Sequence, residues 1–268
     1  MLRVGVIGCG TIGGEICYAI DRGLVQAELV GIFDVSGAAT DRVARRLRQA
    51  PPVRSQGEVI EAADLVVEAT SREVAPGIIR AALGHGRDIM VMSVGGLLAC
   101  LDDVLALAQR GNRRIYVPTG AIAGLDAVKG AAVAQVARVT LTTRKPPRAL
   151  AGAPFVVRNQ IALEGFQEPT VIFTGSAAEA VLAFPANVNV AAALSLAGIG
   201  PERTQVRVVA DPTSDKNIHE IEMEGDFGRM VVRMENVPSP ENPKTSYMAS
   251  LSAIALLRRL TAPLVIGT

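Results

Sequence analysis

Residues 3–15, which read RVGVIGCGTIGGE, constrain the fold of this chain more than any other stretch. A short apolar run ends at Ile7, and three glycines follow it in G-x-G-x-x-G spacing while a helical apolar pattern begins among them. The first glycine allows a tight turn, the second lets a pyrophosphate approach the backbone, and the third lets the helix pack closely on the strand. Free N–H groups at the helix start then face the phosphates. The predicted cofactor contacts are Gly8, Gly10, Thr11, Ile12 and Gly13.

An acidic residue stands where a dinucleotide site needs one. A second apolar run, 29–33, ends at Asp34, which lies 21 residues after Gly13. A carboxylate at about this distance accepts hydrogen bonds from the adenosine ribose, and it disfavours a ribose 2′-phosphate. Asp34 therefore favours NAD, while Arg42 and Arg45 on the following helical segment are compatible with NADP. Both cofactors remain open at this stage.

Strands and helices alternate from residue 1 to about residue 117. Further strands are expected at 65–69, 88–94 and 114–117, and helices at 37–49, 74–83 and 97–109. This alternation predicts an α/β fold that begins with a Rossmann-type, doubly wound parallel sheet. Ligands of such sheets bind beyond the carboxyl ends of the strands. Thr70, Ser71 and Gly95 are therefore expected beside the ribose and nicotinamide half of the cofactor.

The pattern changes near Pro118 to several strands at short spacing. Strands are expected at 136–144, 205–210, 217–224 and 228–234, and helices at 125–135, 175–184 and 187–196, the last with Asn187 as its N-cap. These elements predict a mixed or antiparallel sheet covered by helices on one face. A terminal helix, expected to start after Asn242-Pro243, would return to the first domain. The predicted domains are 1–120 for dinucleotide binding, 121–241 for catalysis and oligomerisation, and 242–268 for the returning helix.

The composition excludes several classes of function. The net charge of +1 provides no strong field for nucleic acid or an anionic membrane surface. No apolar run reaches the roughly 18 residues of a membrane-spanning helix, and a chain that enters a strand at once leaves no room for a signal peptide. Three cysteines without metal-ligand spacing suit a reducing compartment. A cytoplasmic protein without a metal site is therefore expected.

The two histidines of the chain have different expected places. His85 lies in a helix-to-strand turn at the amino end of the parallel sheet, away from the ligand side. His219 lies on the expected strand 217–224 and shares a face with Ile221 and Met223. Either a core histidine or an active-site histidine fits that position. The glutamates that alternate with it are interpreted as solvated rather than as metal ligands.

Several segments together resemble one known family. They are GVIGCGTIG at 5–13, VEATS at 67–71, VMSVGGL at 91–97, PTGAIAGLDA at 118–127, FPANVNVAAALSLAG at 184–198, Asp211-Pro212, NIHEIEMEGDFG at 217–228 and NPKTSYMA at 242–249. In this order, and over nearly the whole chain, they are similar to the L-aspartate dehydrogenase family. The resemblance implies NAD- or NADP-dependent oxidation of L-aspartate to iminoaspartate, which hydrolyses to oxaloacetate and ammonia. It also implies a supply of iminoaspartate to NAD biosynthesis and a homodimer or homotetramer.

The resemblance also implies roles for individual residues. It marks His219 as the active-site residue, and Ala123 and Asn189 as cofactor contacts. A histidine that titrates near neutral pH would take a proton from the substrate amine or activate the water that attacks the imine. The two substrate carboxylates need donors, and the candidates are Lys216, Lys244 and Thr245, with the N–H groups of the helix expected after Asn242.

Two other kinds of protein compete with this interpretation. One is a neighbouring dehydrogenase, such as a homoserine dehydrogenase, acting on another small amino acid or a semialdehyde. The signatures of dihydrodipicolinate reductase (His-His and Asp-Ala-Pro-Ser-Gly-Thr) and of phosphorylating aldehyde dehydrogenases (Ser-Cys-Thr) are absent from the sequence. The other is a non-catalytic protein that senses NAD, which needs no histidine opposite the cofactor.

Overall fold

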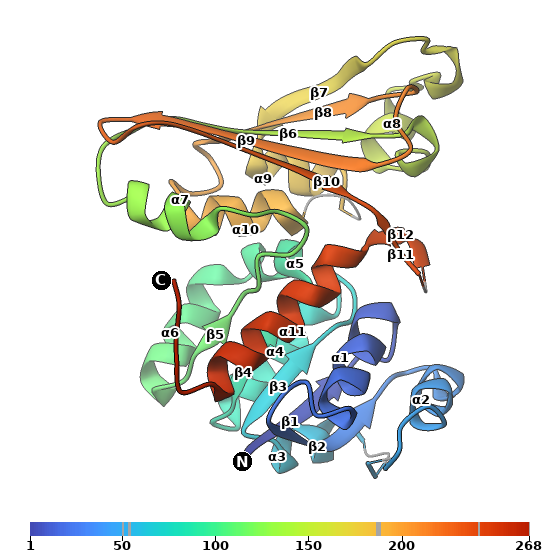
Figure 1. The fold of residues 1–268 in the computed structure, drawn as a ribbon, viewed down its shortest axis with the longest axis vertical. Coiled ribbons are helices and arrows are strands. Elements are labelled where there is room, and N and C mark those ends of the chain that lie inside the picture. The colour runs from blue at the N-terminus through green and yellow to red at the C-terminus, as the bar shows by residue number, and fades with distance from the viewer. Residues whose placement is uncertain (50, 53–54, 186–188, 241, 268) are drawn as a thin grey trace. The chain divides into compact units, whose positions relative to one another are not determined.

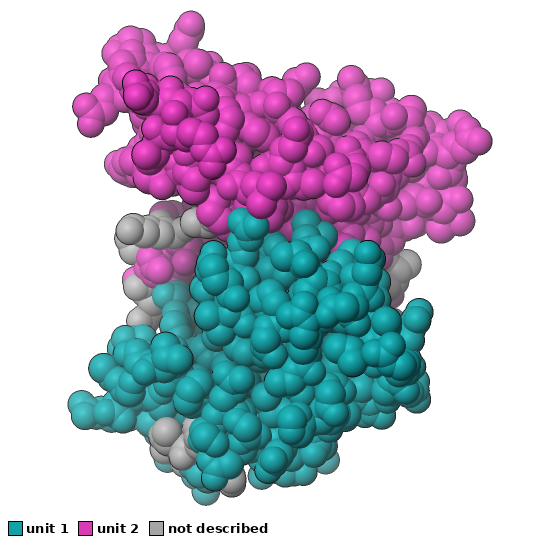
Figure 2. All heavy atoms as spheres, turned by 180° about the vertical axis from the view of Figure 1, so that it is seen from behind, with its two compact units in different colours: residues 1–118, 249–265 teal, residues 119–248, 266–268 magenta. Residues whose placement is uncertain are grey.

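The structure is a computed structural model that describes residues 1–49, 51–52, 55–185, 189–240 and 242–267 (Figure 1). The chain divides into two compact units (Figure 2). The first contains residues 1–118 and 249–265, and the second contains residues 119–248 and 266–268. Two of the predictions, Asn187 as a helix N-cap and the Lys244 side chain as a substrate donor, lie outside the described residues.

The first unit is built on a five-stranded parallel sheet with the strand order β2-β1-β3-β4-β5. The strands are β1 (Leu2–Ile7), β2 (Ala27–Phe33), β3 (Leu65–Glu68), β4 (Asp88–Val91) and β5 (Ile115–Tyr116). This arrangement confirms the predicted doubly wound fold. The order reverses beside β1, so the carboxyl ends of β1 and β3 border the crevice in which such sheets bind ligands.

Both faces of this sheet are covered, because alternate residues of β1 pack on different helices. Val4 and Val6 join a core with Ile16 of α1, whereas a Cβ on Gly5 would lie 2.7 Å from Val59 of α3. The helices of this part are α1 (Thr11–Asp21), α2 (Gly37–Ala44), α3 (Gln56–Ala62), α4 (Ala75–Gly84), α5 (Val94–Leu98) and α6 (Leu101–Gly111).

Two boundaries in the first unit differ from the sequence prediction. The strand expected over 88–94 ends at Val91, and Gly95 lies inside the short helix α5 rather than in a turn. The neighbouring glycine gives the physical reason, since a Cβ on Gly96 would lie 2.5 Å from the Arg72 carbonyl oxygen. Gly96 therefore allows α5 to pack against the loop that follows β3.

The terminal helix also starts later than predicted. Residues Asn242–Ser246 form the strand β12, which pairs with β11 (Pro238–Ser239), and helix α11 spans Tyr247–Thr261. The sequence predicts an N-cap and a first-turn proline here, but proline is equally at home in a short edge strand. Two residues of α11, Ala253 and Leu257, are fully buried in the core of the first unit beside Ile16.

The second unit contains a mixed sheet, as expected, with the order β10-β9-β6-β8-β7. Its strands are β6 (Val136–Lys145), β7 (Thr170–Ser176), β8 (Thr204–Ala210), β9 (Asn217–Gly225) and β10 (Gly228–Asn236). Only the β6–β8 pair is parallel. The helices are α7 (Leu125–Ala131), α8 (Pro154–Arg158), α9 (Ala177–Ala183) and α10 (Asn189–Ala197), with single 3-10 turns at Pro147–Ala149 and Leu163–Gly165.

Helices α9 and α10 cover one face of this sheet (Figure 1). The helix predicted over 175–184 begins two residues later, because Ser176 ends β7 and caps α9 in a capping box with Glu179. In the part of the chain that the structure describes, no helix has the length and apolar character needed to cross a bilayer.

Candidate active site

The glycine turn lies at the carboxyl end of β1, and the protein itself fills the space around two of its glycines. Gly8 has a φ of 104°, and a Cβ there would lie 2.3 Å from the Ala69 carbonyl oxygen. A Cβ on Gly13 would lie 1.9 Å from the Gly8 carbonyl oxygen. Both positions require glycine for folding, because close backbone contacts exclude a side chain at each and Gly8 also has a left-handed φ.

Gly10 differs from Gly8 and Gly13. Apart from Gly10 itself and its two chain neighbours, no atom of the described residues lies within 4 Å of the position that its Cβ would occupy, and the residue is exposed. Thr11 and Ile12, the first two residues of α1, follow it directly. Because Gly10 has no side chain and faces open space at a helix N-terminus, a pyrophosphate can approach the backbone there. The residues present therefore fit a dinucleotide.

Asp34 is held beside this turn. Its carboxylate accepts hydrogen bonds from the Cys9 N–H at 2.7 Å and from the Ser36 N–H at 2.8 Å. Arg42 donates from Nη2 to the Cys9 carbonyl oxygen at 3.0 Å. An acid and a guanidinium therefore both contact the loop to which an adenosine ribose would bind.

A buried carboxylate that the sequence reasoning missed connects the two loops after β3 and β4. Glu68 has no exposed surface, yet it accepts four hydrogen bonds. Two come from the N–H and the hydroxyl of Thr70, each at 2.7 Å, and two from the N–H and the hydroxyl of Ser93, at 3.0 and 2.9 Å. The sequence does contain a signal for Glu68, because an acidic residue there ends the apolar run LVVE. Glu68 thereby fixes the position of Thr70 at the ligand end of the sheet.

Replacing Glu68 with Ala is expected to destabilise the protein by about 2–5 kcal/mol, because several buried donors lose their acceptor. Glu68→Gln keeps the shape and one acceptor oxygen, so a smaller loss is expected. Glu61→Ala, at an exposed position on α3, is the matched control. Urea unfolding curves measure the difference, and equal stabilities for Glu68→Ala and Glu61→Ala would show that this network contributes nothing.

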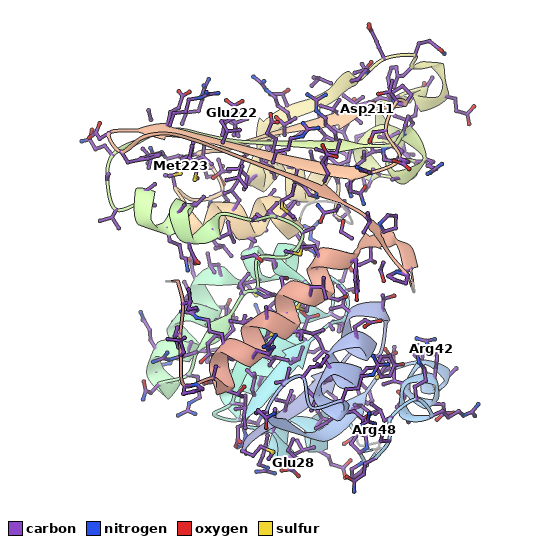
Figure 3. All side chains as sticks on the ribbon, viewed as in Figure 1. Glu28, Arg42, Arg48, Asp211, Glu222 and Met223 are labelled. Carbon is purple, nitrogen blue, oxygen red and sulfur yellow. The ribbon has the colours of Figure 1, made fainter. Side chains whose placement is uncertain are left out.

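In the second unit, His219 lies on the covered face of the sheet. The side chain is 3% exposed, and Nδ1 lies 3.1 Å from the Thr143 hydroxyl oxygen on the neighbouring strand β6. Residues of β9 alternate as predicted, with His219, Ile221 and Met223 buried. Figure 3 labels Glu222 and Met223, which point to opposite faces. The glutamates at 220, 222 and 224 form ion pairs with arginines on the outer face.

The prediction that His219 titrates near neutral pH is wrong for the protein without substrate. Burial, with a smaller contribution from the nearby Lys145 cation, lowers the pKa of His219 to about 3. The imidazole is therefore neutral across the physiological range, with one ring nitrogen as donor and the other as acceptor.

Lys145 is the second residue that sequence reasoning missed. It ends β6, is 7% exposed, and lies two residues beyond Thr143, the register partner of His219. Burial lowers the pKa of Lys145 to about 8. The alternation of VARVTLTTRK was a usable signal, because it places 139, 141, 143 and 145 on one face. The structure confirms that all four are buried.

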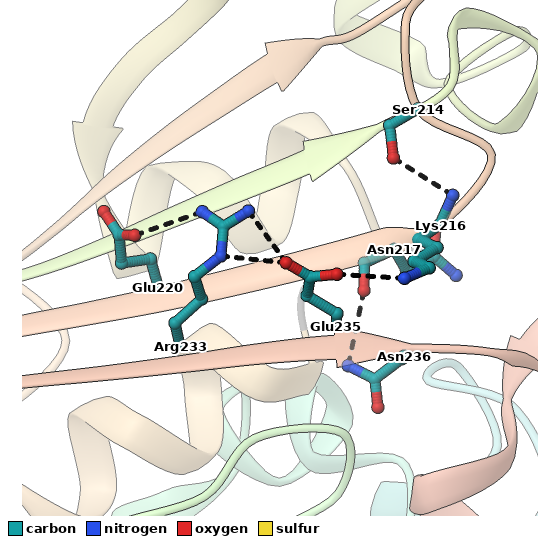
Figure 4. A network of polar contacts seen from close by, with 7 residues as sticks. All are labelled: Ser214, Lys216, Asn217, Glu220, Arg233, Glu235 and Asn236. Atoms are coloured by element: carbon teal, nitrogen blue, oxygen red, sulfur yellow. Dashed lines mark hydrogen bonds and ion pairs between the residues drawn. The ribbon is translucent and has the colours of Figure 1, made fainter.

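The remaining predicted residues lie in different places. Lys216 has a half-exposed side chain, and its Nζ lies 3.0 Å from Glu235 in a surface network with Arg233 (Figure 4). Thr245 is on β12 and half-buried. Asn189 is the first residue of α10 and exposed. Thr70 and Ser71 follow β3, and His85 caps α4 at the amino end of β4.

Ala123 lies in the loop before α7, which is fixed to the sheet by a buried amide. Asn236 of β10 donates from Nδ2 to the Ala121 carbonyl oxygen at 2.9 Å. Its Oδ1 is buried without a hydrogen-bond partner among the described residues. The hydrogen bond therefore fixes this loop to β10, the strand beside β9, on which His219 lies.

A hollow of about 1010 Å³ lies elsewhere in the second unit. The loops after β6 and β8 line it, with residues such as Pro146, Arg148 and Thr213. None of the site residues predicted from the sequence lines this hollow. His219 and Lys145 lie instead on the face of the sheet that α9 and α10 cover.

Neither metal nor thiol chemistry has support in the described residues. Within the described ranges, no three His, Cys, Asp or Glu side chains are grouped to hold a metal ion. Cys9, inside the glycine turn, is buried, and this burial raises its pKa to about 11. A thiol with this pKa fills space and is a poor nucleophile.

A dinucleotide cradle at the switch point of a doubly wound sheet, with a second unit that buries a histidine and a lysine, defines a two-domain, pyridine nucleotide-dependent oxidoreductase. Residues 8–118 match the family model described as the NAD binding domain of homoserine dehydrogenase, and residues 126–260 match the one described as aspartate dehydrogenase, C-terminal. The chain belongs to the L-aspartate dehydrogenase family.

Individual relatives agree with this assignment. The chain is 51% identical to an L-aspartate dehydrogenase of Methanosarcina barkeri, with 100% of both sequences covered. It is 45% identical to one of Bradyrhizobium diazoefficiens, with 100% of this chain and 94% of the relative covered. Among solved structures, aspartate dehydrogenase of Thermotoga maritima matches with a TM-score of 0.77 at 24% identity, with both chains fully covered. A homoserine dehydrogenase of Thiobacillus denitrificans matches with a TM-score of 0.62 at 14% identity, covering 98% of this chain and 74% of that one.

Proposed function

We propose that the protein oxidises L-aspartate to iminoaspartate with a pyridine nucleotide, and that hydrolysis then yields oxaloacetate and ammonia. The observation that carries this proposal is the buried His219, hydrogen-bonded to Thr143, in the part of the chain that matches the family's C-terminal model. The homoserine dehydrogenase alternative is not favoured, because the family model of that enzyme matches only residues 8–118, whereas residues 126–260 match the aspartate dehydrogenase model. A supply of iminoaspartate to NAD biosynthesis belongs to the same proposal.

The bound cofactor supplies the hydride acceptor for this reaction. We infer that the turn residues Gly8, Gly10, Thr11, Ile12 and Gly13 bind its pyrophosphate and that Asp34 binds the adenosine ribose. Residues assigned to the rest of the cofactor are Thr70, Ser71, Gly95, Ala123 and Asn189. The open space at Gly10 and the fixed Asp34 carboxylate support the first two assignments.

His219 moves the proton in this proposal. The Nδ1 proton is assigned to the hydrogen bond with Thr143, so Nε2 carries the lone pair. Nε2 takes a proton from the substrate ammonium, which must be neutral before hydride leaves Cα, or from the water that attacks the imine. The two carboxylates of the substrate raise the low pKa of His219 when they bind, because opposite charges favour the imidazolium. Thr245 and Lys244 remain candidate donors to these carboxylates.

NAD is the proposed preferred cofactor, and NADP the weaker one. Asp34→Asn removes the charge that binds the ribose hydroxyls and repels a 2′-phosphate, while Arg42 stays in place. The KM for NAD is expected to rise about 10–100-fold, the loss of a charged hydrogen bond, and the KM for NADP to fall. Steady-state kinetics with both cofactors measure the change. An unaltered NAD-to-NADP ratio would exclude Asp34 as the selectivity residue.

We also propose a cytoplasmic homodimer or homotetramer that binds neither nucleic acid nor membranes. The near-neutral net charge, and the paired charges of both signs on the outer face of the second sheet, support the part of this proposal that excludes nucleic acid and membranes. Native mass spectrometry tests the assembly, and a monomer at micromolar concentration would contradict it.

Initial rates at 340 nm test the proposed activity. L-aspartate with NAD is expected to give a rate that D-aspartate and L-homoserine do not give. Binding of NAD without turnover of any amino acid would support a cofactor-sensing protein instead.

A further inference from the structure

Two asparagines face each other at one end of the second sheet. Asn217 begins β9, Asn236 ends β10, and the two residues pair across the strands with 8% and 3% of their surfaces exposed. His219 lies two residues further along β9, so its side chain is on the same face as that of Asn217. The asparagine pair is therefore a buried polar neighbour of the proposed acid–base residue.

The Asn236 amide connects two segments of the main chain. Its Nδ2 donates to the Asn217 carbonyl oxygen at 3.4 Å (Figure 4) and to the Ala121 carbonyl oxygen at 2.9 Å. The loop that contains Ala121 is held to β10 at a second point, because Gly124 has a φ of 79° and a Cβ there would lie 2.8 Å from Val232. This loop is therefore fixed to the strand beside the one that carries the histidine.

The Asn217 side chain reaches a third segment. Its Nδ2 donates to the Ser246 hydroxyl oxygen at 3.4 Å. Ser246 ends β12, and Thr245, a proposed donor to a substrate carboxylate, precedes it. Three segments of the second unit with proposed roles in the reaction therefore meet at this pair of side chains: the loop with Ala123, the strand with His219 and the strand with Thr245.

We propose that Asn236, together with Asn217, is a positioning residue for the oxidation, which holds the cofactor contact, the acid–base residue and the carboxylate donor of the second unit in one arrangement. This inference rests on the proposed function, which gives those three residues their roles. Asn236 acts through the segments that it connects and contacts neither substrate nor cofactor. A displacement of about 1 Å, caused by a mutation far from the chemistry, can slow a reaction on the order of 100-fold. Loss of the bridge should therefore appear in the rate of hydride transfer.

Asn236→Leu removes the bridging donor at nearly constant size. The variant is expected to fold, because leucine also removes Oδ1, which is buried without a partner among the described residues. Stopped flow measures the rate constant of NAD reduction in a single turnover, with protein in excess over NAD and aspartate saturating. This rate constant is expected to fall about 10–100-fold, and deuterium at the substrate Cα should slow it further. Because a first-order rate constant does not depend on the amount of folded protein, partial unfolding cannot produce the fall.

Asn159→Ala is the matched control. The Asn159 side chain makes the same kind of bond, from Nδ2 to the Phe155 carbonyl oxygen at 2.8 Å, but it lies at the exposed end of α8. This variant is expected to keep the wild-type rate constant. A second variant, Ser246→Ala, removes only the bond from Asn217 and leaves the buried amides in place. It should raise the KM for aspartate about 2–10-fold, the effect of one neutral hydrogen bond, because the strand with Thr245 is then held less firmly.

Hydrogen exchange of the protein without substrate tests the anchor separately from activity. Mass spectrometry of peptides that span 119–124 should show amide exchange about 2–10-fold faster in Asn236→Leu than in wild type, because one hydrogen bond that opposes local opening is lost. Peptides over α9 should exchange at the wild-type rate in the same sample.

The outcomes separate this inference from the proposed function. A single-turnover rate constant in Asn236→Leu equal to that of Asn159→Ala, or unchanged exchange of the loop 119–124, overturns the positioning role even if aspartate is oxidised. An unchanged KM for aspartate in Ser246→Ala overturns the role of Asn217. Faster exchange of the loop in a protein that does not oxidise aspartate supports the anchor and contradicts the proposed reaction.

Discussion

His219→Gln is expected to lower kcat for aspartate oxidation by about 10²–10⁴-fold, the usual contribution of a positioned acid–base group. Glutamine keeps a polar side chain within reach of the Thr143 hydroxyl, so the buried hydrogen bond at this place is not simply deleted. What glutamine lacks is a nitrogen lone pair that can accept a proton. The loss should therefore fall on kcat, with little change in NAD affinity.

The control for this experiment is the other histidine. His85 is exposed, and its ring Nδ1 lies 2.8 Å from the Ala81 carbonyl oxygen at the end of α4. His85→Gln is expected to keep full activity. Steady-state kinetics and thermal unfolding of both variants decide the matter, and near-normal turnover by a folded His219→Gln protein would end the catalytic assignment.

Two glycines of the turn, Gly13 and Gly10, should respond to alanine in distinct ways. Gly13→Ala is expected to cost more than about 3 kcal/mol of stability, as overpacking does at its upper end, because the new Cβ would meet the Gly8 carbonyl oxygen. Gly10→Ala adds a methyl group where the protein has open space, at a φ of −73° that alanine adopts freely. Stability should be kept, while NAD affinity falls at least about tenfold, or 1.4 kcal/mol.

Thermal unfolding and NAD titration of the two variants measure this contrast directly. Gly57→Ala, in the first turn of α3, is the control for both, because no described residue beyond its own stretch of chain lies within 4 Å of its Cβ position. Unchanged NAD affinity in Gly10→Ala would mean that the cofactor phosphates bind elsewhere.

The parallel half of the fold was predictable because its signals are local. Strand and helix periodicity, the glycine spacing and Asp34 all lie within short windows of sequence. The mixed second sheet followed from strands at short spacing. The wrong boundaries involve residue types that occur in more than one kind of element. Gly95 was expected to close a strand but lies in α5, and Pro243 was expected to start a helix but lies in β12.

The site in the second unit could be predicted only in part. His219 and the buried face of β9 follow from alternation, and the same rule applied to β6 identifies Lys145 as buried. The pairing of Thr143 with His219 does not follow, because the two residues are 76 positions apart and meet only through the strand order. Nor does a histidine considered alone reveal the burial that, with a smaller contribution from the Lys145 cation, lowers the pKa of His219.

The most direct test of the central claim follows the hydrogen on the substrate. L-aspartate carrying deuterium at Cα is incubated with the protein and NAD, and the reduced cofactor is analysed by mass spectrometry. The proposed function predicts one deuterium in each reduced cofactor, together with equal amounts of ammonia and oxaloacetate. Reduced cofactor without deuterium, or no reduction by a protein that binds NAD, would contradict oxidation at Cα of aspartate.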